Sequence, residues 1–549
     1  MSSQVQNQTD AERQLDKASP QQRLTAQATS SRALSDVLAQ GGAWLDQHWL
    51  LTLAVVVTIA LWLRLVLLAQ SSLWVDEMWS IGISRMPWHV FPWIMRHQDP
   101  NMPLYYAVLH FWMGLGGSEV VVRSLSVLFA VATIPALYAL GTYLYDKRVA
   151  LIASSLMVVH AFHVQWSQEA RSYSLLVLLL TLSCLFFAMS IRNPRPLNFV
   201  LYVLASVLAF HAHIFAALVL VAQAASLLFL KRREVPWKGL LSSAGAIAFL
   251  TAPLGLLIVE RARNPWLPLG WLPKTSLHVV YDQFYAVAGN ADFPGSSGGK
   301  LILGAYALVC LLAFFAWVGT WRSEGNSFQS WRTAFLICWL GVPIAMLVAA
   351  SLAQPILMNR YLLICIPALV LLAAQWLRSI RPAALSLLAV VILLAVAAAR
   401  LPQYYRHRAE FQPWKSATDY VLGKQLPGDA AIFCVAPGRL LFDYYRERYH
   451  GASSATPAVI YPEWSDSRND PKVLDYLPPL TGSLSQAALR NHERVWLVVY
   501  HDTFPATRQA RDQIEKFLAT KYGNVDMAKF YGVTVLLYSN GSLGHVSRY

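Results

Sequence analysis

Residues 49–69 read WLLTLAVVVTIALWLRLVLLA, and SSLWVDEMWS follows at residues 71–80. The apolar run is interrupted only by Arg64, near its end, and is long enough to cross about 30 Å of hydrocarbon as one helix. Two adjacent carboxylates, Asp76 and Glu77, then lie at the membrane surface between tryptophans, which favour that depth. Because ionisable groups beside a long hydrophobic body are costly unless they are used, this pair is the first candidate for chemistry.

The composition indicates a membrane protein. Of the 549 residues, 56% are hydrophobic and only 13% are charged, and the mean hydropathy is +0.41. Soluble proteins carry about 25% charged residues. Repeated long apolar runs predict a polytopic α-helical fold, since a β-barrel would show short alternating segments. The net charge of +14 does not indicate nucleic acid, because basic residues in membrane proteins mostly record topology.

Eleven apolar runs are predicted to cross the membrane, which gives an architecture of about eleven transmembrane helices. They are residues 49–69, 122–144, 149–166, 174–191, 197–212, 214–230, 238–258, 301–321, 332–350, 361–377 and 383–400.

Lysine and arginine predominate in the loops on one side of these spans, as at Lys231, Arg232 and Arg233. The positive-inside rule makes that side cytoplasmic and gives a multi-pass protein of the plasma (inner) membrane. The amino terminus is then cytoplasmic, and an odd number of spans places the carboxyl terminus outside, in the periplasm.

The chain divides into three parts. Residues 1–48 are predicted to be a cytoplasmic tail that is disordered or partly helical. Residues 49–400 form the membrane domain, whose external loop at 70–121 carries the acidic pair. Residues 401–549 are predicted to form an extracytoplasmic α/β domain with a mixed sheet. Its expected strands and flanking helices are strands at 430–435, 495–500 and 533–538 and helices at 416–422 and 507–522.

A third acid, Asp99, lies in the same external loop as Asp76 and Glu77. A hairpin of surface helices would bring these acids together, either to hold a general base and orient an acceptor or to share a divalent cation. Adjacent residues on a helix point about 100° apart, so Asp76 and Glu77 do not face one site equally. The alternative is that these carboxylates cap a surface helix.

Three arginines are expected at the outer membrane face, namely Arg123, Arg171 and Arg360. Three guanidinium groups at one depth suit a lipid-linked phosphate or pyrophosphate. Snorkelling anchors are the alternative for any one of them. Glu169 is close enough in sequence to pair structurally with Arg171.

Two histidines, His211 and His213, fall in an outward turn between short spans. A neutral imidazole there could bind a metal or hydrogen-bond a phosphate. In a helix the spacing of two residues points the side chains apart, so a structural role is favoured for His211, and both readings stay open for His213.

With these residues in hand, the chain resembles the GT-C superfamily of integral-membrane glycosyltransferases, over residues 49–400. It is most like the protein O-mannosyltransferase-like branch, which includes bacterial family-39-type enzymes and the lipid A aminoarabinose transferases. The likeness rests on the order of Asp76-Glu77, Asp99-x-Asn101-x-Pro103-Leu104-Tyr105-Tyr106, Arg123-Ser124, Ser167-Gln168-Glu169-Ala170-Arg171-x-Tyr173, His213 and Arg360-Tyr361. Met102 departs from the pattern, since many relatives have a second proline there.

The resemblance implies a polyprenyl-phosphate sugar donor and a lipid, glycan or protein acceptor that approaches from outside. By that likeness Asp76 is the catalytic base, and Glu77 and Asp99 support it or orient the acceptor. The donor phosphate is assigned to Arg171, Arg360 and Arg123. Supporting roles are assigned to Tyr105, Glu169, Tyr173 and His213. No cofactor is required, and a divalent cation stays open, with Asp99 and His213 as its candidate ligands.

The expected chemistry is a single displacement that inverts the anomeric centre, with a carboxylate as base and arginines to offset charge on the leaving phosphate. It would make the protein a hexosyl- or pentosyltransferase. The alternative is a transporter, flippase or ligase of lipid-linked saccharides. Transporters usually show internal repeats and charged or broken helices at mid-membrane, whereas here the charges gather at the outer face, which favours an enzyme.

Overall fold

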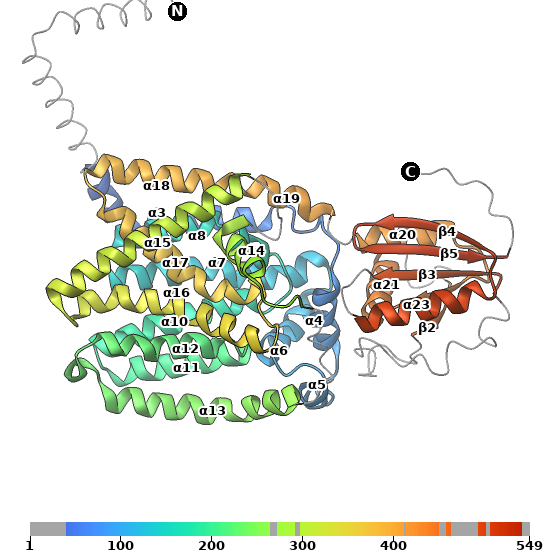
Figure 1. Ribbon diagram of the computed structural model, residues 1–549, viewed down its shortest axis with the longest axis horizontal. Coiled ribbons are helices and arrows are strands. Elements are labelled where there is room, and N and C mark those ends of the chain that lie inside the picture. Colours follow the sequence, from blue (N-terminus) through green and yellow to red (C-terminus); the bar gives the residue numbers. More distant parts are fainter. Residues whose placement is uncertain are drawn as a thin grey trace, which may run out of the picture.

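A computed structural model of the protein describes residues 40–263, 272–290, 297–410, 413–449, 457–462, 492–500 and 505–540. A long bundle of helices carries a smaller domain with a β-sheet at one of its ends (Figure 1). The tail predicted at residues 1–48 falls mostly outside the described residues, apart from a short helix at Gln40–Gln47.

The bundle is built from helices that are apolar along most of their length. They are α3 (Trp49–Leu65), α7 (Glu119–Leu144), α8 (Lys147–Val159), α9 (Ala161–Ser167), α10 (Tyr173–Arg192), α11 (Pro196–Ala212), α12 (Ala216–Ser226), α13 (Trp237–Arg263), α15 (Ser297–Glu324), α16 (Phe328–Ala353), η6 (Asn359–Cys365), α17 (Ile366–Ser379) and α18 (Ala383–Ala398). The polar helix α19 (Leu401–Glu410) follows α18. Short elements between them are η2 (Leu227–Phe229), η3 (Arg232–Glu234), α14 (Leu277–Tyr285) and η5 (Ala286–Asn290).

These helices confirm a multi-span α-helical membrane protein. In the part of the chain that is described, seven helical stretches are long and apolar enough to cross a membrane, or up to nine if two bent pairs count as single spans. The bent pairs are Gln40–Gln47 with α3, at 82°, and α8 with α9, at 64°. The remaining predicted runs coincide with the shorter apolar helices α11 and α12. The number of eleven crossings therefore stays a prediction.

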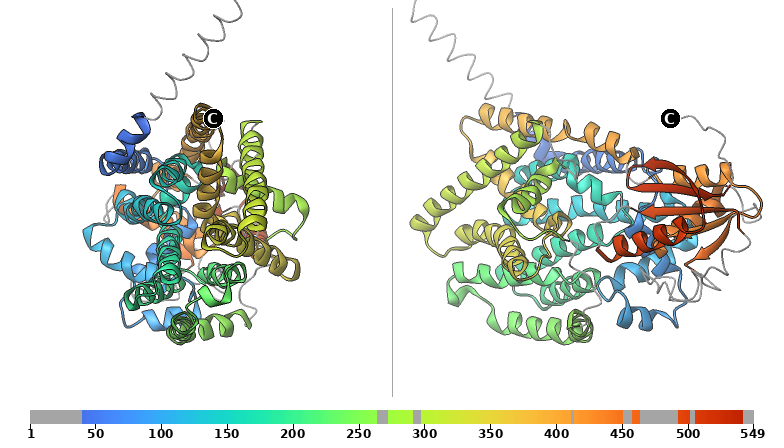
Figure 2. Two further views of the ribbon diagram at one scale, coloured as in Figure 1. Left: turned by 90° about the vertical axis from the view of Figure 1, so that its left-hand side faces the viewer. Right: turned by 45° about the vertical axis from the view of Figure 1, so that its right-hand side comes forward.

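The spans differ in how deeply they are buried. The view along the bundle in Figure 2 shows the helices packed side by side. The apolar windows of α10 and of the η6–α17 stretch are 78% buried, whereas those of α13 and α15 are only 22% buried. The first two therefore form the centre of the bundle, and the latter two present apolar side chains at its rim, where lipid is expected.

The predicted external loop at residues 70–121 is folded into helices at the end of the bundle that faces the small domain (Figure 1). It contains α4 (Val75–Arg85), α5 (Phe91–His97), α6 (Pro103–Trp112) and η1 (Met113–Leu115). Helix α4 begins just before the acidic pair, so both carboxylates occupy its first turn, where the helix dipole stabilises negative charge.

The small domain has an α/β architecture with a mixed sheet, as predicted. Its elements are α20 (Trp414–Lys424), β1 (Ala430–Phe433), α21 (Ala436–Tyr449), β2 (Ala458–Tyr461), β3 (Arg494–Tyr500), α23 (Pro505–Ala519), β4 (Asn524–Phe530) and β5 (Val533–Ser539). The strand order is β2-β1-β3-β5-β4, with β1 parallel to β2 and β3, and β5 antiparallel to β3 and β4.

Alternate residues of the sheet face two different cores. Ala431, Phe433 and Trp496 pack with side chains of α20 and α21 in the core that continues into the bundle. Ile432 and Leu497, on the opposite face, pack with side chains of α23 in a second core. One face of the sheet is therefore covered by α20 and α21, which lie next to the membrane domain, and the other by α23.

A close contact between α7 and α8 gives a test of the packing. A Cβ atom added at Gly141 would lie 2.9 Å from Ala150 Cα and 3.1 Å from Leu371 Cδ2. We expect Gly141→Ala to lower the free energy of unfolding by about 1–3 kcal/mol through this overlap. Gly245→Ala is the matched control in a helix, because no atom lies within 4 Å of its added Cβ. Equal thermal midpoints for the two variants in detergent would contradict the described packing.

Candidate active site

The two adjacent acids of α4 have different environments. The Asp76 side chain is 28% exposed, and its Oδ2 pairs with Arg360 Nη1 at 2.9 Å. The Glu77 side chain is completely buried and pairs with Arg123. The divergence expected for neighbouring helical residues is therefore observed, with only Asp76 facing an accessible region.

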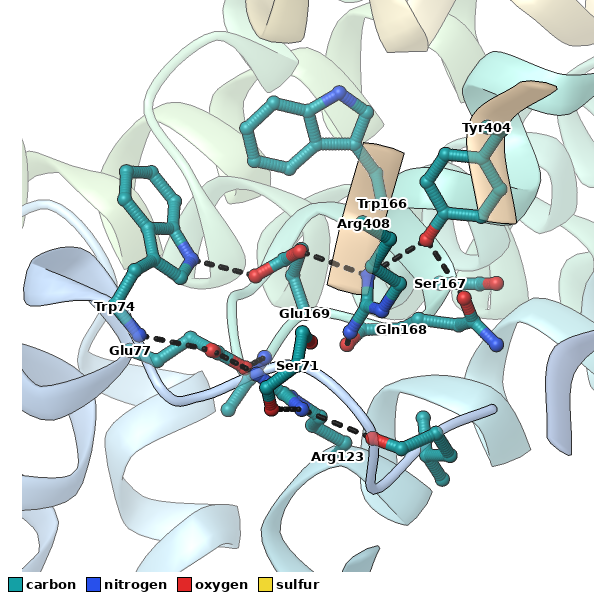
Figure 3. Close-up of polar contacts among 12 residues, drawn as sticks. Ser71, Trp74, Glu77, Arg123, Trp166, Ser167, Gln168, Glu169, Tyr404 and Arg408 are labelled. Atoms are coloured by element: carbon teal, nitrogen blue, oxygen red, sulfur yellow. Dashed lines mark hydrogen bonds and ion pairs between the residues drawn. The ribbon is translucent and has the colours of Figure 1, made fainter. Parts of the chain in front are cut away.

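Arg123 is saturated by partners inside the protein. Its Nε and Nη2 donate to the Glu77 carboxylate at 2.7 and 2.6 Å. Its remaining three N–H groups donate to the carbonyls of Leu68, Ser71 and Ser72, each at 2.9 Å. All five donors of the guanidinium are thus used on the loop before α4 and on Glu77 (Figure 3).

This geometry bears on the roles that the resemblance implies for Arg123 and Glu77. No N–H of Arg123 is left for a donor phosphate. Glu77 Oε1 also accepts from the Ala170 N–H at 2.9 Å, and its Oε2 accepts from the Trp74 N–H at 3.4 Å. The Glu77–Arg123 pair therefore joins α4, α7 and the α9–α10 loop, and its position is structural.

Arg171 and Arg360 are arranged differently from Arg123. Arg171 comes from the α9–α10 loop, and its Nη1 donates to the Asp76 carbonyl and to Ser80 Oγ, each at 3.2 Å. Arg360 comes from η6, at the start of a central span. In each of these two guanidinium groups, Nε is buried and has no hydrogen-bond partner among the described residues. The structure thus brings Asp76, Arg171 and Arg360 together and leaves donor capacity on both arginines.

His213 lies close enough to Arg171 and Arg360 for their positive charge to lower its pKa. It lies in the turn between α11 and α12 and is only 1% exposed. Burial, together with the charges of Arg171 and Arg360, lowers the pKa of His213 to about 3. The imidazole is therefore neutral at physiological pH, and an anion near it would be favoured by both arginines.

The Asp99 loop closes on the same region. Asp99 accepts hydrogen bonds from the Asn101 N–H at 3.0 Å and from the Tyr106 hydroxyl. The Asn101 side chain reaches across to His213, with Nδ2 at 3.1 Å from Nε2, and its Oδ1 accepts from the Ile214 N–H. Asp99 is therefore connected to His213 through Asn101, which links the segment between α5 and α6 to the α11–α12 turn.

Tyr105 and Tyr173 lie close to Arg171. The Tyr105 hydroxyl is 3.1 Å from Ser126 Oγ, which donates to the Arg171 carbonyl at 3.2 Å. The Tyr173 ring lies 5.7 Å from the ring of His213 and 6.0 Å from the Arg171 guanidinium carbon. These contacts hold the backbone and the side chain of Arg171.

The candidate cation ligands Asp99 and His213 are separated by the Asn101 side chain. Within the described ranges, no group of three or more His, Cys, Asp and Glu side chains gathers in a way that could hold a metal ion. His211 turns to the backbone instead, with Nδ1 2.9 Å from the Val207 carbonyl oxygen.

Glu169 pairs with a residue that the sequence did not indicate. Arg408 of α19 donates to its Oε1 at 3.0 Å, and Trp74 Nε1 donates to its Oε2 at 2.5 Å. Glu169 thus lies between Trp74 and Arg408 in Figure 3, rather than pairing with Arg171. Burial and the nearby Glu77 carboxylate raise the pKa of Glu169 to about 7. Arg408 belongs to no motif, and only its place directly after the last span could have drawn attention to it.

Comparisons with known proteins agree with this architecture. The family model described as dolichyl-phosphate-mannose-protein mannosyltransferase matches residues 98–257, a segment that includes Asp99, Glu169, Arg171 and His213. No curated protein matches the chain.

Several solved structures resemble the chain over most of its length. ArnT from Cupriavidus metallidurans in the apo state has a TM-score of 0.57 at 15% identity, and the match covers 89% of this chain and 98% of that one. The same protein bound to undecaprenyl phosphate gives 0.53 at 16% identity, with the same coverage. The Archaeoglobus fulgidus oligosaccharyltransferase tethered with an acceptor peptide gives 0.50 at 12% identity, covering 91% of this chain and 75% of that one.

The fold is therefore that of the GT-C glycosyltransferases, as the order of the motifs predicted. The family model adds a likeness to mannosyltransferases over residues 98–257.

The saturated Arg123 and the partly free Arg360 should respond differently to substitution. Arg123→Gln leaves the Glu77 carboxylate buried without its partner, and we expect a loss of about 3–5 kcal/mol in stability. Arg360→Gln leaves Asp76 in contact with solvent, so its thermal midpoint should stay close to that of the native protein. Thermal unfolding in detergent measures both, and an Arg123→Gln variant as stable as Arg360→Gln would refute the structural role.

The raised pKa of Glu169 predicts a pH dependence of stability. The pKa rises from 4.5 to about 7 on folding, so the native protein binds more protons than the unfolded chain between these values. The contribution of Glu169 to stability therefore falls as the pH rises through that window. Glu169→Gln removes this slope, and its thermal midpoint should rise relative to the native protein from about pH 5 to about pH 8. Glu447→Gln, on the exposed face of α21, is the control and should follow the native curve.

Proposed function

We propose that the protein is an inverting glycosyltransferase that moves a sugar from a polyprenyl-phosphate donor to an acceptor hydroxyl. The observation that carries the proposal is the cluster of Asp76, Arg171 and Arg360 at the end of the bundle beside the small domain. A carboxylate and two arginines with unused N–H groups match the two requirements of this reaction: a base for the acceptor and a cationic site for the leaving phosphate.

The donor phosphate is assigned to Arg171 and Arg360. Both guanidinium groups are largely buried, which strengthens their attraction for an anion, and each keeps an unpartnered Nε. The neutral His213 beside them adds a polar group without adding charge. Arg123 is left out of this site because its five N–H groups are used elsewhere. A solved relative of the same fold binds undecaprenyl phosphate, which agrees with a polyprenyl carrier.

The reaction is a single displacement. Asp76 accepts the proton of the acceptor hydroxyl, whose oxygen attacks the anomeric carbon of the sugar. The bond from that carbon to the phosphate oxygen breaks, and the phosphate leaves with the electron pair. Its added negative charge is offset by Arg171 and Arg360. Attack from the face opposite the leaving group inverts the anomeric centre.

The ion pair between Asp76 and Arg360 gives the site a resting arrangement. A bound phosphate offers Arg360 a second anionic partner and competes with Asp76 for its N–H groups. Donor binding would thereby loosen the hold of Arg360 on the carboxylate that must accept the acceptor's proton. Asp99 is assigned to holding the Asn101–His213 link that closes the external loop on the site.

The location follows from the same proposal. We assign the site to the outer face of the plasma membrane, with the amino terminus in the cytoplasm and the small domain in the periplasm. The acceptor, whether lipid, glycan or protein, would then approach between the small domain and the end of the bundle. The sugar is a hexose or pentose that the polar site itself does not specify.

The base assignment is tested by Asp76→Asn. The amide keeps the size of the side chain but does not accept a proton, so transfer should fall by at least about 100-fold. The measurement is sugar transfer by purified protein from a panel of synthetic polyprenyl-phosphate sugars, with mass spectrometry of the products. Asp512→Asn, on the exposed surface of α23, is the control and should retain native activity. Native turnover in Asp76→Asn would overturn the assignment.

The phosphate assignment is tested with undecaprenyl phosphate alone. We expect Arg171→Gln and Arg360→Gln each to weaken its binding by about tenfold or more, because each removes a charge-assisted hydrogen bond. Native mass spectrometry of the full chain measures the bound fraction. Arg406→Gln, an exposed arginine of α19, is the control. Unchanged binding in both site variants would exclude these arginines as phosphate ligands.

A further inference from the structure

The C-terminal part of the chain contacts the loop at residues 66–74, which precedes α4. Three consecutive residues of that loop, Ser72, Leu73 and Trp74, are each engaged by it. The Lys415 N–H donates to Ser72 Oγ at 3.1 Å. The Leu73 N–H donates to the Tyr445 hydroxyl at 2.6 Å. Two residues of the small domain therefore contact the chain within four residues of Asp76.

The third contact passes through Glu169. Trp74, the residue before α4, donates its indole N–H to one carboxylate oxygen, and Arg408 donates to the other. Arg408 is only 5% exposed, and it also donates to the Gln168 carbonyl at 2.7 Å and to the Tyr404 hydroxyl at 2.6 Å. Figure 3 shows this chain of contacts from α19 to the start of α4.

The same segment also contacts the end of α3. The Tyr404 hydroxyl donates to Gln168 Oε1 at 2.6 Å, and Gln168 Nε2 donates to the carbonyls of Arg64 and Val66, each at 2.8 Å. Helix α19 is thereby connected to both ends of the loop that joins α3 to α4. Arg123 of α7 binds three carbonyls of the same loop, those of Leu68, Ser71 and Ser72. The position of the loop is therefore fixed by contacts from α7 and from the C-terminal part of the chain.

We propose that Tyr445 and Arg408 are positioning residues: through them the small domain and α19 fix the position of the Asp76 side chain. This inference rests on the proposed role of Asp76 as base. Neither residue touches the reacting atoms. Tyr445 acts through the backbone of Leu73, and Arg408 acts through Glu169 and Trp74. A base must lie within hydrogen-bond reach of the acceptor hydroxyl, and a shift of the first turn of α4 would move Asp76 out of that reach.

The donor site should be less sensitive to these contacts. Arg360 comes from η6, and the Arg171 carbonyl accepts from Ser126 Oγ of α7, so neither arginine belongs to α4 or to the loop before it. Loss of the Tyr445 hydroxyl should therefore lower kcat and leave phosphate binding unchanged. A general loss of folding would lower both.

Helix α21 provides a matched pair of variants. Tyr445→Phe removes only the hydroxyl that accepts from Leu73. Tyr444→Phe removes the neighbouring hydroxyl, which donates to the Gly117 carbonyl at 2.9 Å and so contacts the membrane domain away from the start of α4. Both rings are kept, including their contact with each other.

The experiment is hydrogen–deuterium exchange of the full chain in phosphatidylethanolamine and phosphatidylglycerol nanodiscs. In Tyr445→Phe we expect exchange of the amides of residues 73–78 to rise about fivefold, with no such rise in Tyr444→Phe. Arg408→Gln should raise the same amides about tenfold, whereas Arg406→Gln should not. No change in Tyr445→Phe, or an equal change in both tyrosine variants, would overturn the proposal.

The functional readout separates this inference from the proposed function. Tyr445→Phe should lower kcat about tenfold and leave the binding of undecaprenyl phosphate at the native level. Unchanged kcat, or a loss of phosphate binding of the same size, would overturn the positioning role. If Asp76→Asn keeps native turnover, the proposed function fails, while the exchange result still decides whether the domain holds the loop.

Discussion

The buried ion pair between Glu77 and Arg123 is the interaction on which the rest of the site depends. Two charges taken out of water are costly, and such a pair is sustained only when its geometry is good and its remaining hydrogen-bonding groups are satisfied. Here the guanidinium uses every N–H, and the carboxylate accepts from two backbone amides as well. The pair joins α4, α7 and the α9–α10 loop at one point.

This fixed point explains how two neighbouring residues supply one buried carboxylate and one accessible carboxylate. Glu77 points into the protein, and the turn of the helix directs Asp76 away from it, toward Arg360. The α9–α10 loop that donates to Glu77 also carries Arg171 next in sequence. Because Ala170 is bound to Glu77, Arg171 is placed beside Asp76, and the acidic and basic halves of the site keep a fixed relation.

The sequence predicted the fold better than the site. Long apolar runs located the bundle helices because burial in lipid demands apolar side chains along a whole span. Strands β2 and β4 were missed, the latter because it lies at a sheet edge where none of its residues is buried, so it has no apolar core-facing pattern. Residue type predicted the cluster of Asp76, Arg171 and Arg360. It did not separate Arg123 from the other arginines, because their difference lies in hydrogen bonds to Leu68, Ser71 and Ser72 that only the folded chain forms. Arg408 contacts Glu169 and Tyr445 contacts Leu73, each across more than 200 residues of sequence, and no local pattern encodes such contacts.

In the proposed site, Arg171 and Arg360, and not Arg123, receive the phosphate beside Asp76. The most direct measurement is an experimental structure of the full chain bound to undecaprenyl phosphate. We expect phosphate oxygens within hydrogen-bond distance of Arg171 and Arg360, next to the Asp76 carboxylate, with the Glu77–Arg123 pair intact. A phosphate bound to Arg123, or one bound away from both of the other arginines, would contradict it.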